Sequence, residues 1–415
     1  MNASPAELLA SSSLRANYQE VRTTTLQLTE PFSQEDLMLQ SMPDCSPAKW
    51  HLAHTTWFFE TFILSEHLPG YRPFDLGFRQ LFNSYYKQVG SHPYRGSRGL
   101  MSRPSLERVR AYRAHVDEAM LRSLATGGEE TAALVELGLN HEQQHQELIV
   151  TDMKHALWSM PMRPGRVNRP LATASSAPVS WIAFEGGMHE IGHAGAGFAF
   201  DNEGPRHEVF LPPFRIASRL VTNAEYMEFM NDGGYRRAEL WLSDGWDTVS
   251  SQGWRSPLYW EEQDGIWLEF TLDGSRELDA AAPACHVSYY EADAFARWRN
   301  ARLPREEEWE VASGSNARSG TFLESRKFHP HPASSGGLEQ MFGDAWEWTA
   351  SPYVAYPGFR AAPGAIGEYN GKFMCNQLVL RGGSCATPQG HIRATYRNFF
   401  PPHVRWQFMG IRLAQ

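Results

Sequence analysis

A break rich in proline and glycine divides this chain into two halves with different sequence patterns. Residues 161–165 (PMRPG) cannot continue a helix, because proline lacks the backbone N–H and clashes with the preceding turn. Short apolar runs separated by Gly, Pro, Asn and Asp follow from Val179 onward. The sequence therefore predicts a helical domain over residues 1–160, a linker over 161–178 and a second domain of short strands and long loops over 179–415.

Four helical segments are predicted before the break. Apolar residues recur there at helical spacing, which places them on one face of each segment. The segments are residues 6–27, a helix capped by Ser46 with Pro47 in its first turn and ending near residue 67, a helix beginning at Ser102 to Pro104, and residues 130–160. One long polar connection, residues 69–103, favours an antiparallel four-helix bundle. In the second half, residues 223–231 and 289–300 stand out as helical.

Two histidines four residues apart stand in the last of these predicted helices. His141 and His145 lie about one turn apart on one face, so the helix can offer two imidazole nitrogens to one metal ion. The run WHLAHTTWFFE (50–60) offers a third histidine, and its spacing does not decide between His51 and His54. Because metal sites in bundles are built from facing helices, these histidines predict a metal centre.

The same run also matches a zinc-hydrolase pattern. In His141-Glu142-x-x-His145 the glutamate would act as a general base. The longer form of that pattern needs glycine at position 148 and histidine at position 151, where Leu148 and Thr151 stand. A zinc hydrolase and a pair of solvent-exposed helix histidines are therefore the alternatives to a redox metal centre.

The charge and cysteine content disfavour several classes of protein. With 38 basic and 47 acidic residues the net charge is −9, which argues against a nucleic-acid partner. The sequence shows no secretory pattern and no run of about 18 apolar residues, so we expect no membrane partner. Four widely spaced cysteines without a C-x-x-C pair indicate a reducing, cytoplasmic location. The oligomeric state is left open.

The second half carries six motifs in a fixed order. They are FEGG (184–187), VTNAEY (221–226), RLPREEEWE (302–310), GDAWEW (343–348), RGGS (381–384) and GIRL (410–413). Together they resemble the formylglycine-generating (sulfatase-modifying factor) fold, a C-type-lectin-like domain, although that family usually has asparagine where Asp344 stands. The first half is similar to DinB-type four-helix bundles with a three-histidine metal site, so the expected fold class is α+β.

The two domains in this order resemble the sulfoxide synthases of ergothioneine biosynthesis (the EgtB type). The resemblance implies an enzyme that uses iron(II) and O₂ to join a thiol to C2 of N-α-trimethylhistidine (hercynine). It implies iron(II) ligation by His54, His141 and His145, which selects His54 over His51. It also implies that Tyr85 and Tyr86, adjacent in the polar connection, serve the oxygen chemistry.

The resemblance further implies a hercynine site. Gln144, inside the metal motif, and Asn398 would bind the carboxylate of hercynine. Phe399 and Phe400 would line the site, where aromatic faces attract a quaternary ammonium. Some members have Trp-Asp in place of Phe399-Phe400, and this difference favours cysteine over γ-glutamyl-cysteine as the sulfur donor.

The thiol substrate also needs a partner for its carboxylate. Arg95 and Arg98 follow the tyrosine pair in the same connection, and a guanidinium suits a bidentate contact with a carboxylate. Exposed surface arginines are the alternative for both positions. For the whole chain, a selenoneine synthase that forms a C–Se bond from a selenosugar is the sister alternative. A zinc hydrolase or a binding module with a lectin-like surface is the more distant one.

Overall fold

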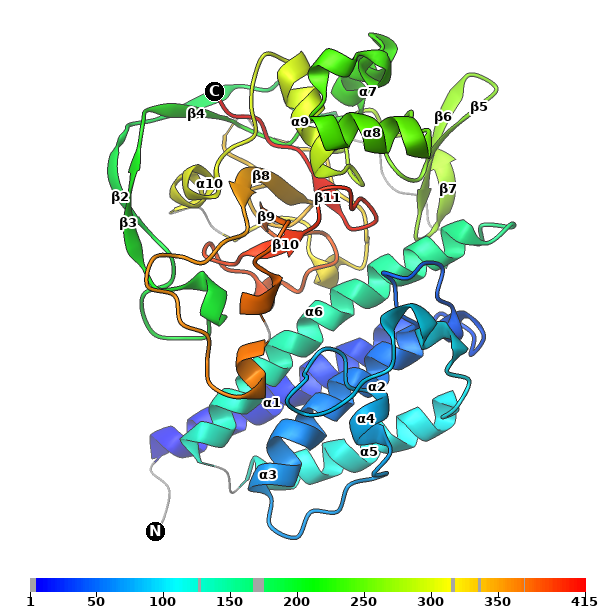
Figure 1. Ribbon diagram of the computed structural model, residues 1–415, viewed down its shortest axis with the longest axis vertical. Helices are drawn as coiled ribbons and strands as arrows, with labels where there is room; N and C mark the ends of the chain where they lie inside the picture. The colour runs from blue at the N-terminus through cyan, green and yellow to red at the C-terminus, as the bar shows by residue number, and fades with distance from the viewer. Residues whose placement is uncertain (1–4, 126–127, 167–174, 315–317, 335–336, 369) are drawn as a thin grey trace. The chain divides into compact units, whose positions relative to one another are not determined.

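The chain forms two compact units in this computed structural model (Figure 1). The first comprises Met1–Pro161 with Pro363–Tyr369, and the second comprises Met162–Ala362 with Asn370–Gln415. The structure describes residues 5–125, 128–166, 175–314, 318–334, 337–368 and 370–415. Residues 167–174 of the predicted linker lie outside the described residues.

The first unit is a helical bundle. Its helix α1 packs against α6, and α2 packs against both α5 and α6 (Figure 1). A π-helical turn, Glu60–Leu64, continues α2 into the short α3. The helices are α1 (Pro5–Thr29), α2 (Ala48–Phe59), α3 (Ser65–His67), α4 (Phe78–Leu81), α5 (Leu106–Ser123) and α6 (Glu129–Ser159).

Two helix starts differ from the sequence prediction. The N-cap of α2 is Pro47, without a side-chain cap, because Ser46 is used elsewhere: its N–H donates to Asp152 and its hydroxyl accepts from Arg98. Helix α5 begins at Leu106 rather than near residue 102. Ser105 caps it, since its hydroxyl accepts the backbone N–H three residues further on.

Buried charged side chains join the four long helices. Glu142 on α6 pairs with Arg22 on α1 at 2.9 Å and with Arg113 on α5. Arg22 also pairs with Asp117 on α5 at 2.6 Å and donates to the hydroxyl of Thr56 on α2 at 3.1 Å. One polar network therefore contacts α1, α2, α5 and α6, and each of its buried charges has an opposite partner.

In its described residues, the second unit contains four small sheets and four short α-helices. Its central sheet has the strand order β10-β9-β8-β11, in which β11 runs parallel to β8 and the other neighbours are antiparallel. The other sheets are β1-β4, β2-β3 and β5-β6-β7, all antiparallel. The strands are β1 (Trp181–Phe184), β2 (Gly187–Ile191), β3 (His207–Leu211), β4 (Phe214–Ala217), β5 (Trp260–Gln263), β6 (Ile266–Thr271), β7 (Gly274–Glu277), β8 (Trp346–Pro352), β9 (Leu378–Arg381), β10 (Asn398–Phe400) and β11 (Met409–Gly410).

Two of the four helices of this unit were predicted from the sequence and two were not. The predicted ones are α7 (Asn223–Asn231) and α9 (Tyr289–Trp298). The missed ones are α8 (Ser243–Gln252) and α10 (Glu306–Ser313). In α10 the inward face carries Glu306 and Glu310, which pair with the buried Arg381 at 3.0 Å each, so hydrophobic periodicity does not mark it.

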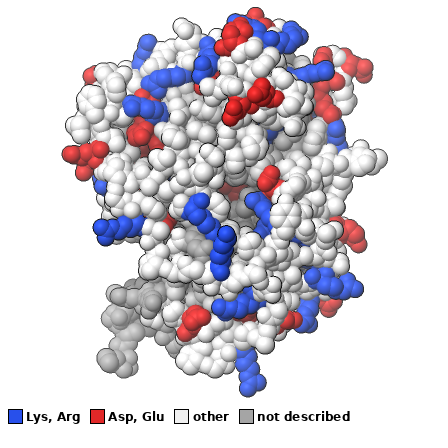
Figure 2. Space-filling model, viewed as in Figure 1, with Lys and Arg blue, Asp and Glu red and all other residues white. Residues whose placement is uncertain are grey.

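The charges and the helix lengths bear on possible partners. Acidic and basic side chains are interspersed on the face drawn in Figure 2. Of the helices in the described part of the chain, none combines the length and the apolar content that crossing a bilayer requires.

Candidate metal centre

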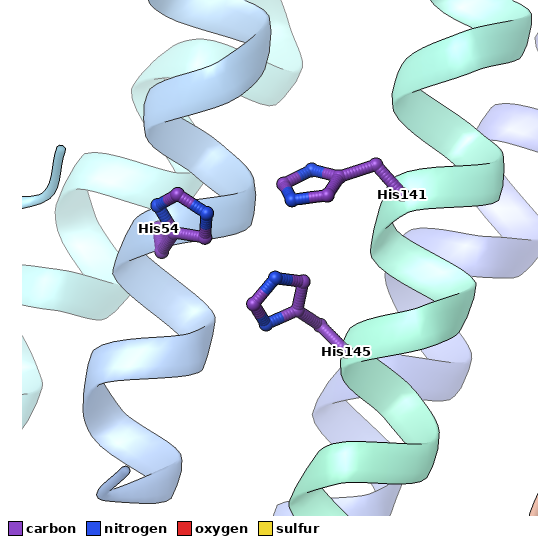
Figure 3. Close-up of side chains that lie close together, drawn as sticks. All are labelled: His54, His141 and His145. Carbon is purple, nitrogen blue, oxygen red and sulfur yellow. The ribbon is translucent and has the colours of Figure 1, made fainter. Parts of the chain in front are cut away.

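Three histidines converge between α2 and α6 (Figure 3). One ring nitrogen from each of His54, His141 and His145 lies within 4.8 Å of those of the other two. His54 comes from α2, and the other two project from successive turns of α6. All three side chains are buried, with exposed fractions of 1%, 1% and 8% respectively. These are the three histidines that the family resemblance singled out, whereas spacing alone had left His51 and His54 open.

The ring of His54 is held in one orientation. Its Nδ1 lies 2.6 Å from the carbonyl oxygen of Phe82, so Nδ1–H donates and Nε2 carries the lone pair. Trp50 and Trp57 stack on this imidazole, with ring centroids 4.5 Å and 5.4 Å away. Within the described part of the chain, the buried Nε2 has no hydrogen-bond partner. A buried lone pair of this kind fits a metal ion in the cluster.

His51 is not one of the three clustered histidines, but its ring contacts the ring of His145. Its Nδ1 lies 2.7 Å from Nδ1 of His145, and its Nε2 lies 3.2 Å from Oδ2 of Asp152. Both ring nitrogens of His51 are therefore engaged. The structure thus brings His54, and not His51, together with His141 and His145.

The three imidazoles are neutral near pH 7. Burial lowers the pKa of His141 to about 3. Burial, followed by the repulsion that a protonated His141 would exert, also places the pKa values of His54 and His145 well below the usual range. Neutral imidazole is the form that binds a metal, so no proton has to leave before coordination.

Glu142 does not point into the cluster. Its carboxylate is fully buried in ion pairs with Arg22 and Arg113. Burial alone would raise the pKa of Glu142, but the charges of Arg113 and Arg22 lower it to about 2. A carboxylate held between two guanidinium groups is not available as a general base, so the zinc-hydrolase alternative lacks its base.

The adjacent tyrosines lie beside the aromatic residues that enclose His54. Tyr86 is buried and contacts Trp57, which stacks on His54, at a centroid distance of 5.6 Å. Tyr85 stacks on Tyr86 at 4.8 Å. Burial, followed by the influence of Tyr86, raises the pKa of Tyr85 well above its usual value, so this phenol keeps its proton at neutral pH. The tyrosine pair is thus linked to the cluster through one indole ring.

The two candidate arginines differ in their surroundings. Arg98 is 4% exposed and lies 3.4 Å over the ring of Trp50. Its Nη1 and Nη2 donate to the hydroxyls of Ser46 and Ser84, each at 2.9 Å. Burial, followed by the charge of Arg95, lowers the pKa of Arg98 to about 9. Arg95 is exposed and donates to a backbone carbonyl. Of the two, Arg98 is the desolvated cation.

The remaining candidates lie on two different units. Gln144 is half-buried on α6, three residues after His141 and therefore on the same helix face. Asn398, Phe399 and Phe400 form strand β10 of the second unit and are all half-buried. Oδ1 of Asn398 accepts the N–H of Phe399 at 2.9 Å. The ring of Phe399 stacks on Tyr353 with centroids 4.0 Å apart, so one of its faces is already covered.

Sequence reasoning missed Asp152 and the role of His51. Asp152 follows His145 by seven residues, which is two helical turns and so the same face of α6. That spacing was a usable signal. The contact between the carbonyl of Phe82 and His54 had no sequence signal, because every residue type carries a backbone carbonyl.

Comparison with known proteins identifies the class of the two domains. Residues 17–149 match the DinB superfamily, and residues 170–333 and 327–415 match the sulfatase-modifying factor enzyme 1-like domain. Ergothioneine biosynthesis protein 1 of Schizosaccharomyces pombe is 26% identical over 52% of this chain and 28% of its own length. The observed fold is α+β, as predicted.

Relatives of matching length define the family. Hercynine oxygenase of Mycobacterium tuberculosis is 32% identical over 97% of this chain and 98% of its own length. Hercynine oxygenase of Mycolicibacterium smegmatis is 31% identical over 98% of this chain and 99% of its own length. The chain belongs to the hercynine oxygenase family and is an oxygenase enzyme. This confirms the resemblance inferred from the sequence motifs.

Proposed function

We propose that this enzyme uses iron(II) and O₂ to join the sulfur of cysteine to C2 of hercynine, with release of a sulfoxide. The observation that carries the proposal is the buried, neutral cluster of His54, His141 and His145 in a chain of the hercynine oxygenase family. Three imidazole ligands leave open positions on a six-coordinate ion. Iron supplies the redox chemistry with O₂ that zinc lacks.

In this proposal His54, His141 and His145 hold the iron, and residues around them bind and orient the substrates. Gln144 lies on the metal face of α6, where its amide suits the carboxylate of hercynine. Tyr85, a neutral phenol, suits a proton donor, with Tyr86 as its stacked neighbour.

We assign binding of the carboxylate of the thiol substrate to Arg98. Its guanidinium is buried against Trp50 and, within the described ranges, meets hydroxyls but no carboxylate at ion-pair distance. A buried cation without an anion is costly, and a substrate carboxylate would offset that cost. Arg95 is exposed and would act from the rim of this site.

We also propose that residues of β10 take part in binding hercynine. Oδ1 of Asn398 is occupied by the N–H of Phe399, so the amide N–H₂ of Asn398 is the group that would donate to the carboxylate. Phe399 and Phe400 would line the site of the trimethylammonium group, which aromatic rings attract. Phe399-Phe400, where some relatives have Trp-Asp, supports cysteine over γ-glutamyl-cysteine.

A cytoplasmic location is proposed from the cysteines. Cys45, Cys285, Cys375 and Cys385, which all lie in the described ranges, form no disulfide, and three of them are buried. Cysteines that are not joined in disulfides are typical of a reducing compartment.

Oxygen consumption by the purified enzyme tests the function. The protein is loaded with iron(II) under anaerobic conditions, and O₂ uptake is followed with hercynine, with cysteine, and with both. We expect rapid uptake only with both substrates, together with a sulfoxide product detected by mass spectrometry. Parallel assays replace cysteine by γ-glutamyl-cysteine or by a selenosugar. If the selenosugar is the only donor that supports turnover, the enzyme forms a C–Se bond instead. No turnover with any donor would overturn the proposal.

A further inference from the structure

The ring of His145 is backed by a chain of buried polar groups that ends on a carboxylate. We propose that His51 and Asp152 are positioning residues for the metal centre, which act by fixing the orientation and tautomer of His145. The inference rests on the proposed function only in that the three histidines bind a metal ion. Neither residue belongs to the three-histidine cluster itself.

The chain of contacts is continuous and buried. Nδ1 of His145 lies 2.7 Å from Nδ1 of His51, and Nε2 of His51 lies 3.2 Å from Oδ2 of Asp152. The same Oδ2 accepts the backbone N–H of Ser46 at 2.8 Å. The exposed fractions of His51 and Asp152 are 2% and 4%. Water therefore does not compete for these bonds.

The direction of the hydrogen bonds follows from the groups present. A carboxylate oxygen accepts, so Nε2 of His51 carries the proton and donates to Asp152. In a neutral ring the other nitrogen, Nδ1 of His51, is then an acceptor. It therefore takes the proton on Nδ1 of His145, and Nε2 of His145 is left with the lone pair. Neutral imidazoles and an accepting carboxylate allow only this arrangement.

His54 is oriented by the same principle with a different partner. Its Nδ1 donates to the carbonyl of Phe82, which also leaves Nε2 as the coordinating nitrogen. Two ligands on different helices are thus held as the same tautomer, one by a backbone carbonyl and the other by the chain of His51 and Asp152. Removing such an outer partner typically costs about 10–100-fold in metal affinity.

Variants of graded severity separate the contribution of the His145–His51 contact from that of the His51–Asp152 contact. His51→Phe keeps an aromatic ring and removes both nitrogens. His51→Asn places an amide oxygen close to the position of Nδ1, so it can still accept from His145 while losing Asp152. Asp152→Asn keeps an oxygen that can accept from both His51 and Ser46, but removes the negative charge. His155→Phe is the matched control, since His155 is a half-buried histidine of α6 whose Nδ1 lies 2.7 Å from a serine hydroxyl outside the cluster.

Metal binding, rather than turnover, is the measurement. Dissociation constants for iron(II) are obtained anaerobically by competition with a chromophoric chelator, and the visible ligand-field spectrum is recorded after loading with cobalt(II). We expect His51→Phe to bind iron(II) about 10–100-fold more weakly, with an altered cobalt spectrum. His51→Asn and Asp152→Asn should fall between wild type and His51→Phe. His155→Phe should match wild type in both measurements.

The outcomes distinguish the two proposals. If wild-type protein binds neither ion, the proposed metal centre and this inference both fail. If wild type binds iron(II) and the His51 and Asp152 variants match it in affinity and cobalt spectrum, only the positioning role is overturned. Should His51→Phe fail to fold, as judged by circular dichroism, the comparison of wild type with His51→Asn and Asp152→Asn decides the question.

Discussion

At the scale of single residues, the proposed metal centre depends on which nitrogen of each imidazole faces the cluster. Nδ1 of His54 is committed to a backbone carbonyl, and its ring is fixed between two indoles. His51, three residues earlier on the same helix, has both nitrogens engaged with His145 and Asp152. Two histidines less than one helical turn apart thus have different surroundings, which suit the proposed roles of His54 as a metal ligand and of His51 as a support for His145.

Replacing His54 by alanine should abolish iron binding. One of three ligands is lost, so we expect iron(II) affinity to fall by more than about 100-fold, beyond the cost of losing an outer partner. Metal analysis after anaerobic loading and gel filtration measures this. The second unit should keep its structure, as judged by its near-ultraviolet circular dichroism. A His54→Ala protein that retains iron at wild-type stoichiometry would remove His54 from the ligand set.

Replacing the phenols should redirect the oxygen chemistry. In Tyr85→Phe or Tyr86→Phe we expect formation of the C–S bond to slow by about 10²–10⁴-fold, the usual contribution of a positioned proton donor. Oxidation of the thiol alone should then account for most O₂ uptake. Tyr94→Phe is the control, because Tyr94 is 72% exposed in the same connection. Unchanged product ratios in both variants would exclude the pair from the chemistry.

At the scale of secondary-structure elements, buried charge pairs hold the elements together where hydrophobic contacts would be expected. In the bundle, Glu142 joins α6 to α1 and α5. In the second unit, Glu347 of β8 pairs with Arg412 at 2.6 Å and accepts the indole N–H of Trp309 from α10. Glu306 of α10 pairs with Arg397 at 2.9 Å. Three of the six sequence motifs of this unit thus supply residues to these buried ion pairs.

Neutralising Glu142 should destabilise the bundle. Its folded pKa of about 2 lies below the ordinary value of 4.5, so its carboxylate stabilises the fold above pH 4.5 and loses this effect as the pH falls toward 2. We expect Glu142→Gln to lower the free energy of unfolding by about 3 kcal/mol at pH 7, from 1.4 kcal/mol per pKa unit. The difference from wild type should shrink by pH 2.5.

Urea unfolding at the two pH values measures this effect. Glu118→Gln is the control, because Glu118 forms an exposed ion pair with Arg122 on α5, and such pairs contribute about 0.2–1 kcal/mol. An equal effect of the two substitutions at pH 7 would contradict a stabilising role for the buried network.

At the scale of the whole molecule, the candidate residues are divided between two units. The three histidines, the tyrosine pair and the arginines belong to the first unit, and Asn398, Phe399 and Phe400 belong to the second. The proposed iron ligands all belong to the first unit. Asn398, Phe399 and Phe400, which are proposed to bind hercynine, belong to the second.

Replacing Asn398 should weaken hercynine binding without weakening iron binding. We expect Asn398→Ala to raise the KM for hercynine about tenfold or more, since a hydrogen bond to a carboxylate contributes about 1.5–3 kcal/mol. Iron(II) affinity and the KM for cysteine should stay at wild-type values. Steady-state kinetics with each substrate varied, together with chelator competition, test this. A loss of iron affinity in this variant would instead indicate a structural defect.

The sequence by itself determined the features that depend on neighbours along the chain. The break at residues 161–165, the helices of the first half, and the placement of His141 and His145 on one face all follow from local spacing. The ordered motifs of the second half identified its fold through their resemblance to a known family. Helix α10 escaped prediction because its inward face carries glutamates that only distant arginines compensate.

Only the tertiary structure decided the features that depend on atoms meeting across helices. Spacing left His51 and His54 open and only the family resemblance favoured His54, whereas the structure shows the His54 ring in the cluster and the His51 ring between His145 and Asp152. The structure also turned Glu142 away from a catalytic role and into an ion pair with two arginines. Hydrogen-bond partners and charges at short range set the role of a polar side chain, and spacing along one helix does not specify them.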